Sequence, residues 1–380
     1  MERSTGKQMG KQTGQPEQQP VQQQPEQPVQ YQAQQQIRNA AKRFVLNGEA
    51  ESFIPYGAGH INRTFLVETK NGAKYILQKI SEAFRVEEMM ENIERVTAFM
   101  AGKCADERSV LHFIKTRDGK SFYKDESGYY RCMVFVDGCI CLQAPRTPGD
   151  LAEAAGAFGN FMHMLADFPA GELHEPIVNF HNTPDRCRIF KEVLEKDPLG
   201  RAKNVQPEIA FFLEREERAG ALQRMRESGQ LPVRVTHNDT KLNNVLYDPV
   251  TGKAVCVLDL DTVMPGLAAY DFGDGVRFGA ATAAEDERDL SLVHTDMELY
   301  RAFRDAYITA CPELTQAEIE SLPLGAWTMT LENGLRFLTD YLDGDRYFAI
   351  HREGQNLDRA RTQIRLAEQM EENPEIAPFL

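Results

Sequence analysis

The first 36 residues contain few apolar positions and no apolar repeat. Gln dominates this segment, together with Pro, Gly and Lys. Such a composition cannot bury enough apolar surface to offset the entropy lost on ordering. We therefore predict a disordered tail over residues 1–36, and we interpret it as a plain extension rather than as a segment that docks a partner.

Regular patterning begins with a short helix, predicted over 37–44, and continues with strand-like runs and one longer helix. The Asn71-Gly72 pair favours a tight hairpin, and the segment 86–100 has apolar residues at helical spacing. The order of three strands, one helix and two strands predicts a small antiparallel sheet. The strand-like runs are 52–56, 64–69, 74–80, 110–115 and 129–136.

Helical patterning dominates after Asp137-Gly138, which we interpret as a hinge. Asp150 is predicted to cap a helix that has Glu153 at its third position. Further helical patterns occur at 190–194, 207–227, 299–310, 316–322, 327–342 and 358–371. We therefore predict an α+β fold of two lobes, with a small antiparallel-sheet lobe over 37–137 and a mainly helical lobe over 138–380.

Composition restricts the classes of function. The chain has 380 residues, 42% of them hydrophobic, which is enough for two packed lobes. Its formal charge of −14 leaves no basic excess for binding nucleic acid or an anionic membrane. No apolar run approaches the roughly 18 residues of a membrane span, and the N-terminal segment does not resemble a signal peptide. Seven scattered cysteines are typical of reduced thiols, so we expect a cytoplasmic protein. No pattern indicates its oligomeric state.

The most informative stretch, 233–261, consists of apolar strand pairs separated by polar turns. Its first turn carries Asp239 and Asn244 on an H-x-D-x4-N spacing, and Asp259 ends the apolar run that follows. Protein kinases use the same spacing, in which the Asp accepts a hydrogen bond from the attacking hydroxyl and the Asn reaches Mg²⁺. The stretch predicts phosphoryl transfer, with Asp239 as catalytic base and with Asn244 and Asp259 as hard oxygen ligands of the metal.

A second motif, Asp271-Phe272-Gly273, matches the magnesium-binding signature of protein kinases. Asp259 follows more directly from the predicted hairpin, so we assign metal binding to Asp259. Asp271 and Asp274 are predicted to brace the loop instead. The imidazole of His237 is predicted to bond the backbone rather than to transfer a proton.

Candidate nucleotide contacts lie in the predicted sheet. Gly57 and Gly59 belong to a loop between two strands, where glycine allows backbone amides to approach phosphates. In the third strand, Gln78 and Lys79 must face opposite sides because side chains alternate. We assign the phosphate contact to Lys79, which carries the charge. Its acidic partner on the next helix is open among Glu87, Glu88, Glu91 and Glu94.

With these residues, the chain resembles the aminoglycoside phosphotransferase and choline kinase superfamily, and within it the N-acetylhexosamine 1-kinases. The resemblance extends from about residue 37 to residue 367 and implies a protein-kinase-like fold. The segments that carry it are GAGHINRTFLV at 57–67, YILQKI at 75–80, NIERV at 92–96, FHNTPDR at 180–186, THNDTKLNNVLYD at 236–248, VLDLDTVMPG at 257–266, YDFGD at 270–274 and RFLTDYLDGDRYF at 336–348.

This resemblance implies ATP and Mg²⁺ as cofactors, an adenine site from Met133 to Phe135, and a sugar pocket in the helical lobe. The sequence departs from the superfamily at the third strand, where the usual Lys or Arg could align with Gln78 rather than with Lys79. That departure concerns the α-phosphate contact and leaves the predicted chemistry unchanged.

The implied acceptor is the anomeric hydroxyl of N-acetylglucosamine or N-acetylgalactosamine. Arg336 and Tyr347 are candidates for holding the sugar, with Asn62 from the glycine loop as a further one. Alternatively, Arg336 could simply pair with Asp340 one helical turn away.

Other acceptors of the superfamily are open alternatives, namely an aminoglycoside, choline, homoserine or methylthioribose. A choline-type site requires an aromatic cage, for which the single Trp327 offers little support. A non-catalytic scaffold is a third interpretation, and the intact set of Asp239, Asn244 and Asp259 argues against it.

Overall fold

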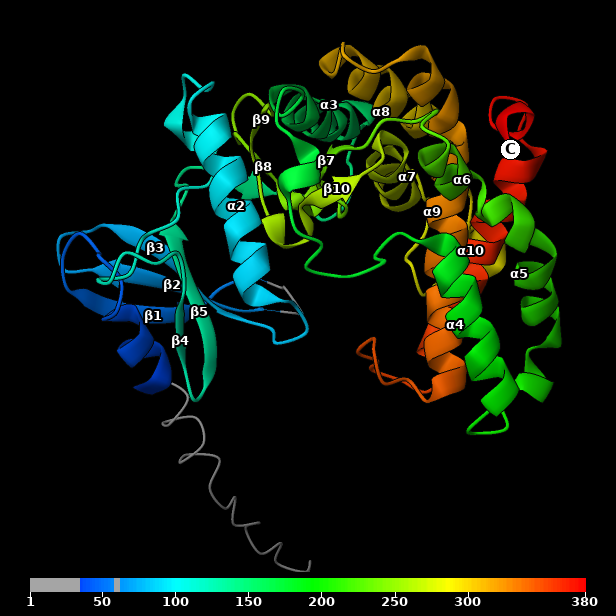
Figure 1. Cartoon of the computed structure of the whole chain (residues 1–380), viewed down its shortest axis with the longest axis horizontal. Coiled ribbons are helices and arrows are strands. Elements are labelled where there is room, and N and C mark those ends of the chain that lie inside the picture. The colour runs from blue at the N-terminus through cyan, green and yellow to red at the C-terminus, as the bar shows by residue number, and fades with distance from the viewer. Residues whose placement is uncertain (1–34, 58–61) are drawn as a thin grey trace, which may run out of the picture.

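A five-stranded antiparallel sheet organises the small lobe (Figure 1). The structure is a computed structural model, and it describes residues 35–57 and 62–380. The predicted tail therefore lies almost wholly outside the described residues, apart from residues 35 and 36, which begin a helix over 35–41. The strand order is β1-β2-β3-β5-β4. The strands are β1 (Ala50–Pro55), β2 (Arg63–Thr69), β3 (Lys74–Ile80), β4 (Tyr123–Asp125) and β5 (Gly128–Val134).

The two faces of this sheet pack against different partners. Tyr75 and Leu77 of β3 belong to a buried cluster with the helix over 35–41. Ile80 and the half-buried Ile76 pack instead with α2 (Val86–Ala101) and with residues of the large lobe. Because side chains alternate along a strand, odd-numbered and even-numbered positions of the central β3 face opposite sides. The even-numbered positions face the large lobe.

The predicted strand over 110–115 is wrong. This segment follows a short 3₁₀ helix, η1 (Glu107–Ser109), and pairs with β5 through a single isolated bridge between Phe113 and Met133. The short β4, which the sequence did not indicate, pairs with the beginning of β5 instead. Segment 110–115 therefore meets only the end of β5 that β4 leaves uncovered, and no ladder forms.

The large lobe consists mainly of helices, with two small sheets on the side toward the small lobe (Figure 1). We call the boundary between the two lobes the cleft. One sheet pairs β7 (Arg234–Thr236) with β10 (Met264–Gly266), and the other joins β6 (Ile140–Cys141), β8 (Val245–Tyr247) and β9 (Ala254–Val257). The helices are α3 (Pro148–Met164), α4 (Thr183–Lys196), α5 (Gln206–Ala219), α6 (Ala221–Glu227), α7 (Ala268–Gly279), α8 (Met297–Ala310), α9 (Gln316–Asp343) and α10 (Gln355–Glu372).

Three helix predictions require correction, and one helix was missed. The pattern over 207–227 forms two helices, α5 and α6, which meet at Gly220. The cap of α3 is Thr147 rather than Asp150. The helix begins at Pro148, and Thr147 and Asp150 bond each other reciprocally in a capping box. The stretches 316–322 and 327–342 form one helix, α9, which continues past its interior Pro323. Helix α7 was not predicted, since its glycines obscure the helical pattern.

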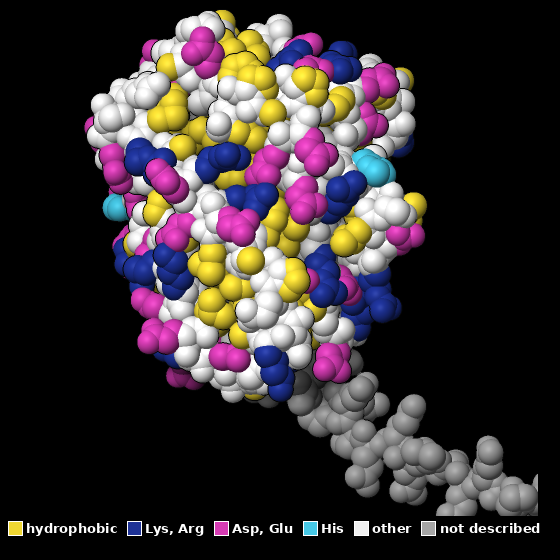
Figure 2. All heavy atoms as spheres, turned by 90° about the vertical axis from the view of Figure 1, so that its right-hand side faces the viewer, with side chains coloured by type: hydrophobic (Ala, Val, Ile, Leu, Met, Phe, Trp, Pro, Cys, Tyr) yellow, Lys and Arg dark blue, Asp and Glu magenta, His cyan; other side chains and the backbone are white. Residues whose placement is uncertain are grey.

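The surface of the large lobe carries charges of both signs. Figure 2 shows Lys and Arg interspersed with Asp and Glu on the face at the end of this lobe. Several of them pair across helices, as Arg215 does with Glu371 at 2.7 Å and Arg361 with Glu208 at 2.7 Å. Within residues 35–57 and 62–380, no helix is both long enough and apolar enough to cross a bilayer.

Helices α7 and α9 cross at glycines, and this close approach sets the depth of α7 in the core. A Cβ atom at Gly325 would lie 2.2 Å from the carbonyl oxygen of Ala269, and one at Gly273 would lie 2.2 Å from that of Gly325. Both obstacles are backbone atoms, which cannot rotate away. The crossing therefore requires glycine on both helices.

We predict that Gly325→Ala lowers the free energy of unfolding by about 1–3 kcal/mol or more, as overpacking of a core does. The matched control is Gly156→Ala in α3, where an added Cβ meets nothing within 4 Å. That change should stabilise the protein by about 0.5–1 kcal/mol, because alanine favours a helix interior. Denaturant unfolding measures both, and equal midpoints for the two variants would contradict the proposed role of the crossing.

Candidate active site

A tight loop after β7 carries the predicted catalytic motif. Asn238 has a left-handed φ of 63°, which turns the chain sharply between His237 and Asp239. The buried ring of His237 accepts a hydrogen bond from the Asp239 backbone N–H at 3.2 Å and donates one to the Leu258 carbonyl at 2.7 Å. Burial lowers the pKa of His237, in keeping with a neutral ring. The predicted structural role of His237 is thus confirmed.

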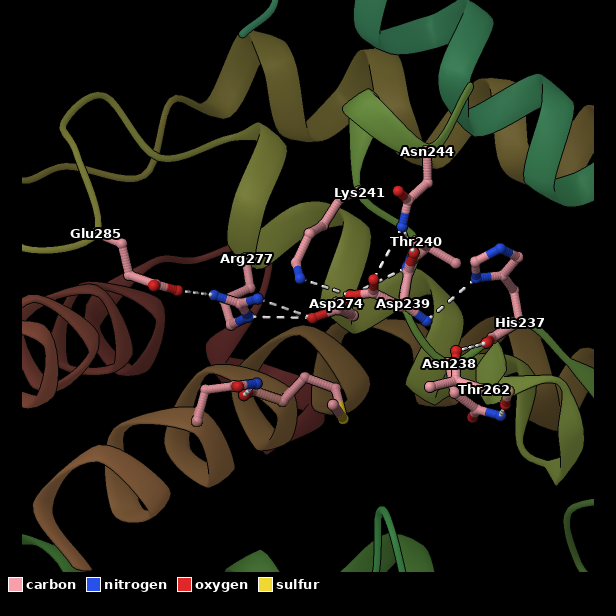
Figure 3. A network of polar contacts seen from close by, with 12 residues as sticks. His237, Asn238, Asp239, Thr240, Lys241, Asn244, Thr262, Asp274, Arg277 and Glu285 are labelled. Atoms are coloured by element: carbon pink, nitrogen blue, oxygen red, sulfur yellow. Dashed lines mark hydrogen bonds and ion pairs between the residues drawn. The ribbon is translucent and has the colours of Figure 1, made fainter. Parts of the chain in front are cut away.

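The loop is braced by two carboxylates of α7. Asp271 accepts the backbone N–H groups of His237 at 2.8 Å and of Asn238 at 2.7 Å. Asp274 accepts the N–H of Thr240 at 3.0 Å and is itself paired with Arg277 (Figure 3). Burial raises the pKa of Asp271 to about 7, although the two backbone N–H groups act to lower it. The bracing role predicted for Asp271 and Asp274 is present.

Asp239 lies between an amide and an ammonium group. Its carboxylate accepts a hydrogen bond from Asn244 Nδ2 at 2.9 Å and is 2.7 Å from Lys241 Nζ (Figure 3). Burial by itself raises the pKa of Asp239, but the positive charge and hydrogen bond of Lys241, together with smaller effects of His237 and Asn244, outweigh it. The pKa therefore lies below its usual range, and the carboxylate is ionised at neutral pH.

Among Asp239, Asp259 and Asp261, Asp259 is the acid without a cationic partner in the described ranges. It has a left-handed φ of 55°, and within the described parts of the chain its carboxylate has no hydrogen-bond or ion-pair partner. Residue Asp259 is exposed, yet surrounding protein and the charges of Asp261 and Asp239 raise the pKa of its carboxyl to about 7.

These residues fit a hard divalent cation. Asn244 donates its Nδ2 hydrogen bonds to Asp239, and its side-chain oxygen has no partner among the residues described. With the unpaired carboxylate of Asp259, it offers the oxygen donors that Mg²⁺ prefers. In the described part of the chain, no three His, Cys, Asp or Glu side chains meet to hold a metal by themselves. Mg²⁺ commonly binds through one or two carboxylates together with waters and substrate phosphates, which suits this donor set.

The predicted adenine site lies where β5 leaves the sheet. Met133 is buried in β5, and the half-buried Phe135 meets Tyr56 edge to face with ring centroids 5.6 Å apart. Gly57, directly after Tyr56, has a φ of 79° and open space where a Cβ would be. Gly59 lies outside the described residues.

The sequence assignment of Lys79 to the phosphates conflicts with its position. Its Cε lies 3.1 Å from where a Cβ of Gly128 would be, on the sheet face opposite to α2 and the large lobe. Gln78 is the residue of this pair that faces the cleft side. The physical reason is the alternation of β3, whose register the surrounding strands fix.

None of the four acidic residues considered as partners for Lys79 forms an ion pair with it. Three of them pair with other groups. Glu88 pairs with Arg85, Glu91 with His174 and Glu94 with Lys115.

Asn62 joins the lobes rather than the predicted sugar residues. Its Nδ2 donates to Asp261 at 2.7 Å and its oxygen accepts the Ser81 N–H at 3.0 Å. Both ends of the amide are thereby engaged.

Arg336 and Tyr347, the two predicted sugar contacts, lie next to each other. The guanidinium of Arg336 stands 5.5 Å from the ring centre of Phe180 and 5.8 Å from that of Tyr347. The alternative pairing of Arg336 with Asp340 is absent among the described contacts, because Asp340 accepts backbone N–H groups of the loop that carries Tyr347.

Phe180 also lines a cavity of about 240 Å³ that reaches Asn238 of the catalytic loop. Neutral polar side chains dominate its wall, and the acid Glu175 lies 3.9 Å from Arg226. Beneath it, the buried Glu332 bonds His181 at 2.9 Å, and His181 contacts the Asn238 carbonyl at 3.3 Å. The cavity is lined by Glu175, Asn179, Phe180, His181, Asn182, Gln223, Arg226, Asn238, Met264, Pro265, Gly266 and Tyr270.

Comparison with known proteins gives the family. A model described as the phosphotransferase enzyme family matches residues 52–308. The chain belongs to this family.

Solved structures agree on the fold of this phosphotransferase. A microcompartment-associated aminopropanol kinase matches with a TM-score of 0.62 at 18% identity, over 87% of this chain and 95% of that one. A choline kinase from Cryptosporidium parvum matches with a TM-score of 0.57 at 13% identity, over 92% and 98%. An amicoumacin kinase in complex with AMP-PNP and Ca²⁺ matches with a TM-score of 0.55 at 15% identity, over 89% and 96%. The two-lobed kinase-like fold is thereby confirmed.

Three charged residues of the cleft were missed in the sequence. Lys241 could have been found, because it lies between Asp239 and Asn244 in the same motif. Arg131 and Asp261 form a buried ion pair between β5 and the segment after Asp259. No local pattern connects these two residues, since their proximity depends on the packing of the lobes.

We predict that Asp271→Asn destabilises the protein by about 1–3 kcal/mol and lowers turnover, because one backbone N–H of the loop then faces an amide N–H group. Asp289→Asn is the control, since exposed Asp289 accepts one N–H in a local turn, which an Asn oxygen can also do. Thermal unfolding and steady-state kinetics report both effects. Equal stability of the two variants would contradict the bracing role.

Proposed function

We propose that this phosphotransferase transfers the γ-phosphate of ATP to the anomeric hydroxyl of N-acetylglucosamine or N-acetylgalactosamine, with Mg²⁺ as cofactor. The observation that carries the proposal is the position of the ionised Asp239 directly after Asn238, which lines a cavity of neutral polar groups. The resemblance of the motifs to N-acetylhexosamine 1-kinases supports the same acceptor.

Asp239 is the proposed base. Its carboxylate accepts the proton of the acceptor hydroxyl as the acceptor oxygen forms a bond to the γ-phosphorus. The bond from that phosphorus to the β–γ bridging oxygen breaks, and ADP leaves with the electron pair. Lys241 Nζ, 2.7 Å from the base, keeps Asp239 ionised and adds positive charge where phosphate charge develops. Asn244 fixes the orientation of the carboxylate through its Nδ2 hydrogen bond.

Asn244 and Asp259 are the proposed metal ligands, through the Asn244 side-chain oxygen and the Asp259 carboxylate, neither of which has a partner within the described ranges. When bound, Mg²⁺ neutralises charge on the phosphate oxygens. Gly57, with Gly59, is the proposed phosphate loop, and Met133, Tyr56 and Phe135 are the proposed adenine contacts.

The cavity supports a small neutral acceptor over a cationic one. Its Glu175 stands near Arg226, so the wall presents little net negative charge to an ammonium group. Trp327 is buried and donates to Glu371, so it forms no aromatic cage. The volume of about 240 Å³ is also below the roughly 300–1,000 Å³ of pockets for drug-sized ligands, which favours a single ring over a multi-ring aminoglycoside.

Hydrogen-bonding groups in and near the cavity suit an N-acetylated sugar. Gln223 has a buried side-chain oxygen with no partner in the described part of the chain, and Asn179 and Asn182 line the same wall. Such amides can bond ring hydroxyls and an acetamido group. Arg336, which lies next to Phe180 of the cavity wall, and Tyr347, which lies next to Arg336, are the proposed further contacts.

We predict that Asp239→Ala lowers turnover by roughly 10²–10⁴-fold while leaving Mg·ATP binding nearly unchanged, which is the usual effect of removing a general base. Asp259→Ala should instead weaken Mg²⁺-dependent nucleotide binding. Equilibrium binding and single-turnover kinetics separate the two variants. Retained turnover in Asp239→Ala would move the base elsewhere, and unchanged Mg·ATP affinity in Asp259→Ala would remove Asp259 from the metal site.

We also predict that the purified protein with Mg·ATP converts N-acetylglucosamine or N-acetylgalactosamine to the sugar 1-phosphate. Plain glucose should be a poorer substrate, because its transition state would be bound more weakly by about 1–3 kcal/mol for each buried group left unpaired. Phosphorus NMR of the product identifies the position of the phosphate. A 6-phosphate, or turnover only with choline or an amino-cyclitol, would contradict the proposed acceptor.

A further inference from the structure

The cleft face of the central strand β3 has no cation at the position where kinases carry one. In protein kinases, a Lys of the third strand contacts the phosphates and is held by a Glu of the following helix. Here Gln78 faces the cleft side, and Lys79 lies on the other face of the sheet. A neutral amide cannot supply the missing charge.

A cation reaches the same place from the neighbouring strand. Arg131 of β5 is the direct register partner of Gln78, so the two side chains lie on the same face of the sheet. Arg131 Nε donates to Gln78 Oε1 at 2.8 Å, and Gln78 Nε2 in turn donates to Thr64 at 3.0 Å. Gln78 therefore positions the guanidinium that replaces a lysine at its own site.

The acid that pairs with this cation also differs in position from the helix Glu of protein kinases. Arg131 Nη1 is bonded to Asp261, and both side chains are nearly inaccessible to solvent, at 3% and 4% exposure. Asp261 follows the proposed metal ligand Asp259 by two positions and receives a second hydrogen bond from Asn62. Helix α2 supplies no acid to Arg131. Its buried Asn92 instead donates to the carbonyls of His174 and Val263.

Two observations indicate that Arg131 serves a ligand in addition to joining the lobes. The guanidinium still has a free donor, because Nη2 has no hydrogen-bond partner among the residues of the described ranges. Its partner Asp261 also lies only two residues after the proposed metal ligand Asp259, so the chain places the guanidinium close to the proposed metal site. A guanidinium presents several donors in one plane and matches phosphate oxygens well.

We propose that Arg131 is the cation that contacts the ATP phosphates, oriented by Gln78 and Asp261 in place of the usual Lys–Glu pair. The inference rests on the proposed use of ATP. It assigns the contact to β5 instead of β3, and it gives Asp261 the part of a positioning residue that does not touch the nucleotide.

The test is equilibrium binding of nucleotides that differ in phosphate number. Arg131→Gln should weaken Mg·ATP and Mg·ADP binding by about 10–100-fold, the effect of losing a charged hydrogen bond, and should change adenosine binding by less than threefold. Arg108→Gln is the matched control, because Arg108 is an exposed arginine of the same lobe that pairs with Asp106 at 3.0 Å. Its affinities should equal those of the wild type.

Other variants separate phosphate binding from a purely structural role. Arg131→Gln leaves Asp261 without its cation, so the double variant Arg131→Gln/Asp261→Asn, which removes both charges, should keep the phosphate-dependent loss while regaining thermal stability. Asp261→Asn alone should weaken Mg·ATP binding less than Arg131→Gln does. Arg131→Lys should restore part of the affinity.

Three results would overturn the inference. The first is an equal loss for adenosine and ATP in Arg131→Gln, which indicates only a displaced lobe. The second is wild-type affinity in Arg131→Gln, and the third is a phosphate-dependent loss in Lys79→Gln instead. If the wild-type protein itself bound no nucleotide, the proposed function would fail and this inference with it. Wild-type binding with an unaffected Arg131 variant would refute the inference alone.

Discussion

The buried carboxylate of Asp271 is the interaction on which the catalytic loop depends. It lies in the first turn of α7, where the N–H groups of the helix favour a negative charge, and it accepts two successive backbone N–H groups of the loop. Those bonds hold the left-handed turn at Asn238 and therefore the direction of Asp239. The position of α7 depends in turn on its glycine crossing with α9. Core packing and the geometry of the base are thus one connected system.

The charges of the cleft divide into paired acids and one unpaired acid. Asp239 has Lys241 and Asp261 has Arg131, while Asp259 has no cation within the described residues. Ionising an unpaired carboxyl beside two other carboxylates costs free energy unless a cation binds there. The raised pKa of Asp259 reflects this cost. In the proposed function, an incoming Mg·nucleotide brings the missing positive charge, and its phosphate oxygens contact Lys241 and the proposed Arg131.

The assembly of the candidate site could be predicted from the sequence because it is local, whereas its proposed chemistry stays a prediction. Asp239, Asn244 and Asp259 belong to one continuous turn-and-strand segment, so their spacing alone indicates how they meet. The bracing Asp271 was also assigned correctly, since Asp259 already followed from the hairpin. The fold class could be predicted because the order of strands and helices is that of the two-lobed kinase-like fold.

Contacts between distant segments could not be predicted in the same way. Alternation in β3 indicates that Gln78 and Lys79 face opposite sides, but the side that meets the cleft depends on the packing of α2 and of the helix over 35–41. The pairing of Arg131 with Gln78 and Asp261 needs both the sheet register and the closure of the lobes. The cap at Thr147 was missed because Asp150 has the same capping chemistry, and only the geometry shows that it lies inside the helix.

The central claim is that Asp239 takes the proton from an acceptor hydroxyl held in line with the γ-phosphate. Its most direct test is the structure of a ternary complex with Mg²⁺, a non-hydrolysable ATP analogue and N-acetylglucosamine. We expect the anomeric oxygen about 2.6–3.2 Å from the Asp239 carboxylate, which is the distance for general base catalysis, and the metal bound by Asn244 and Asp259. A complex in which the γ-phosphate and the acceptor hydroxyl lie away from Asp239 would contradict the account.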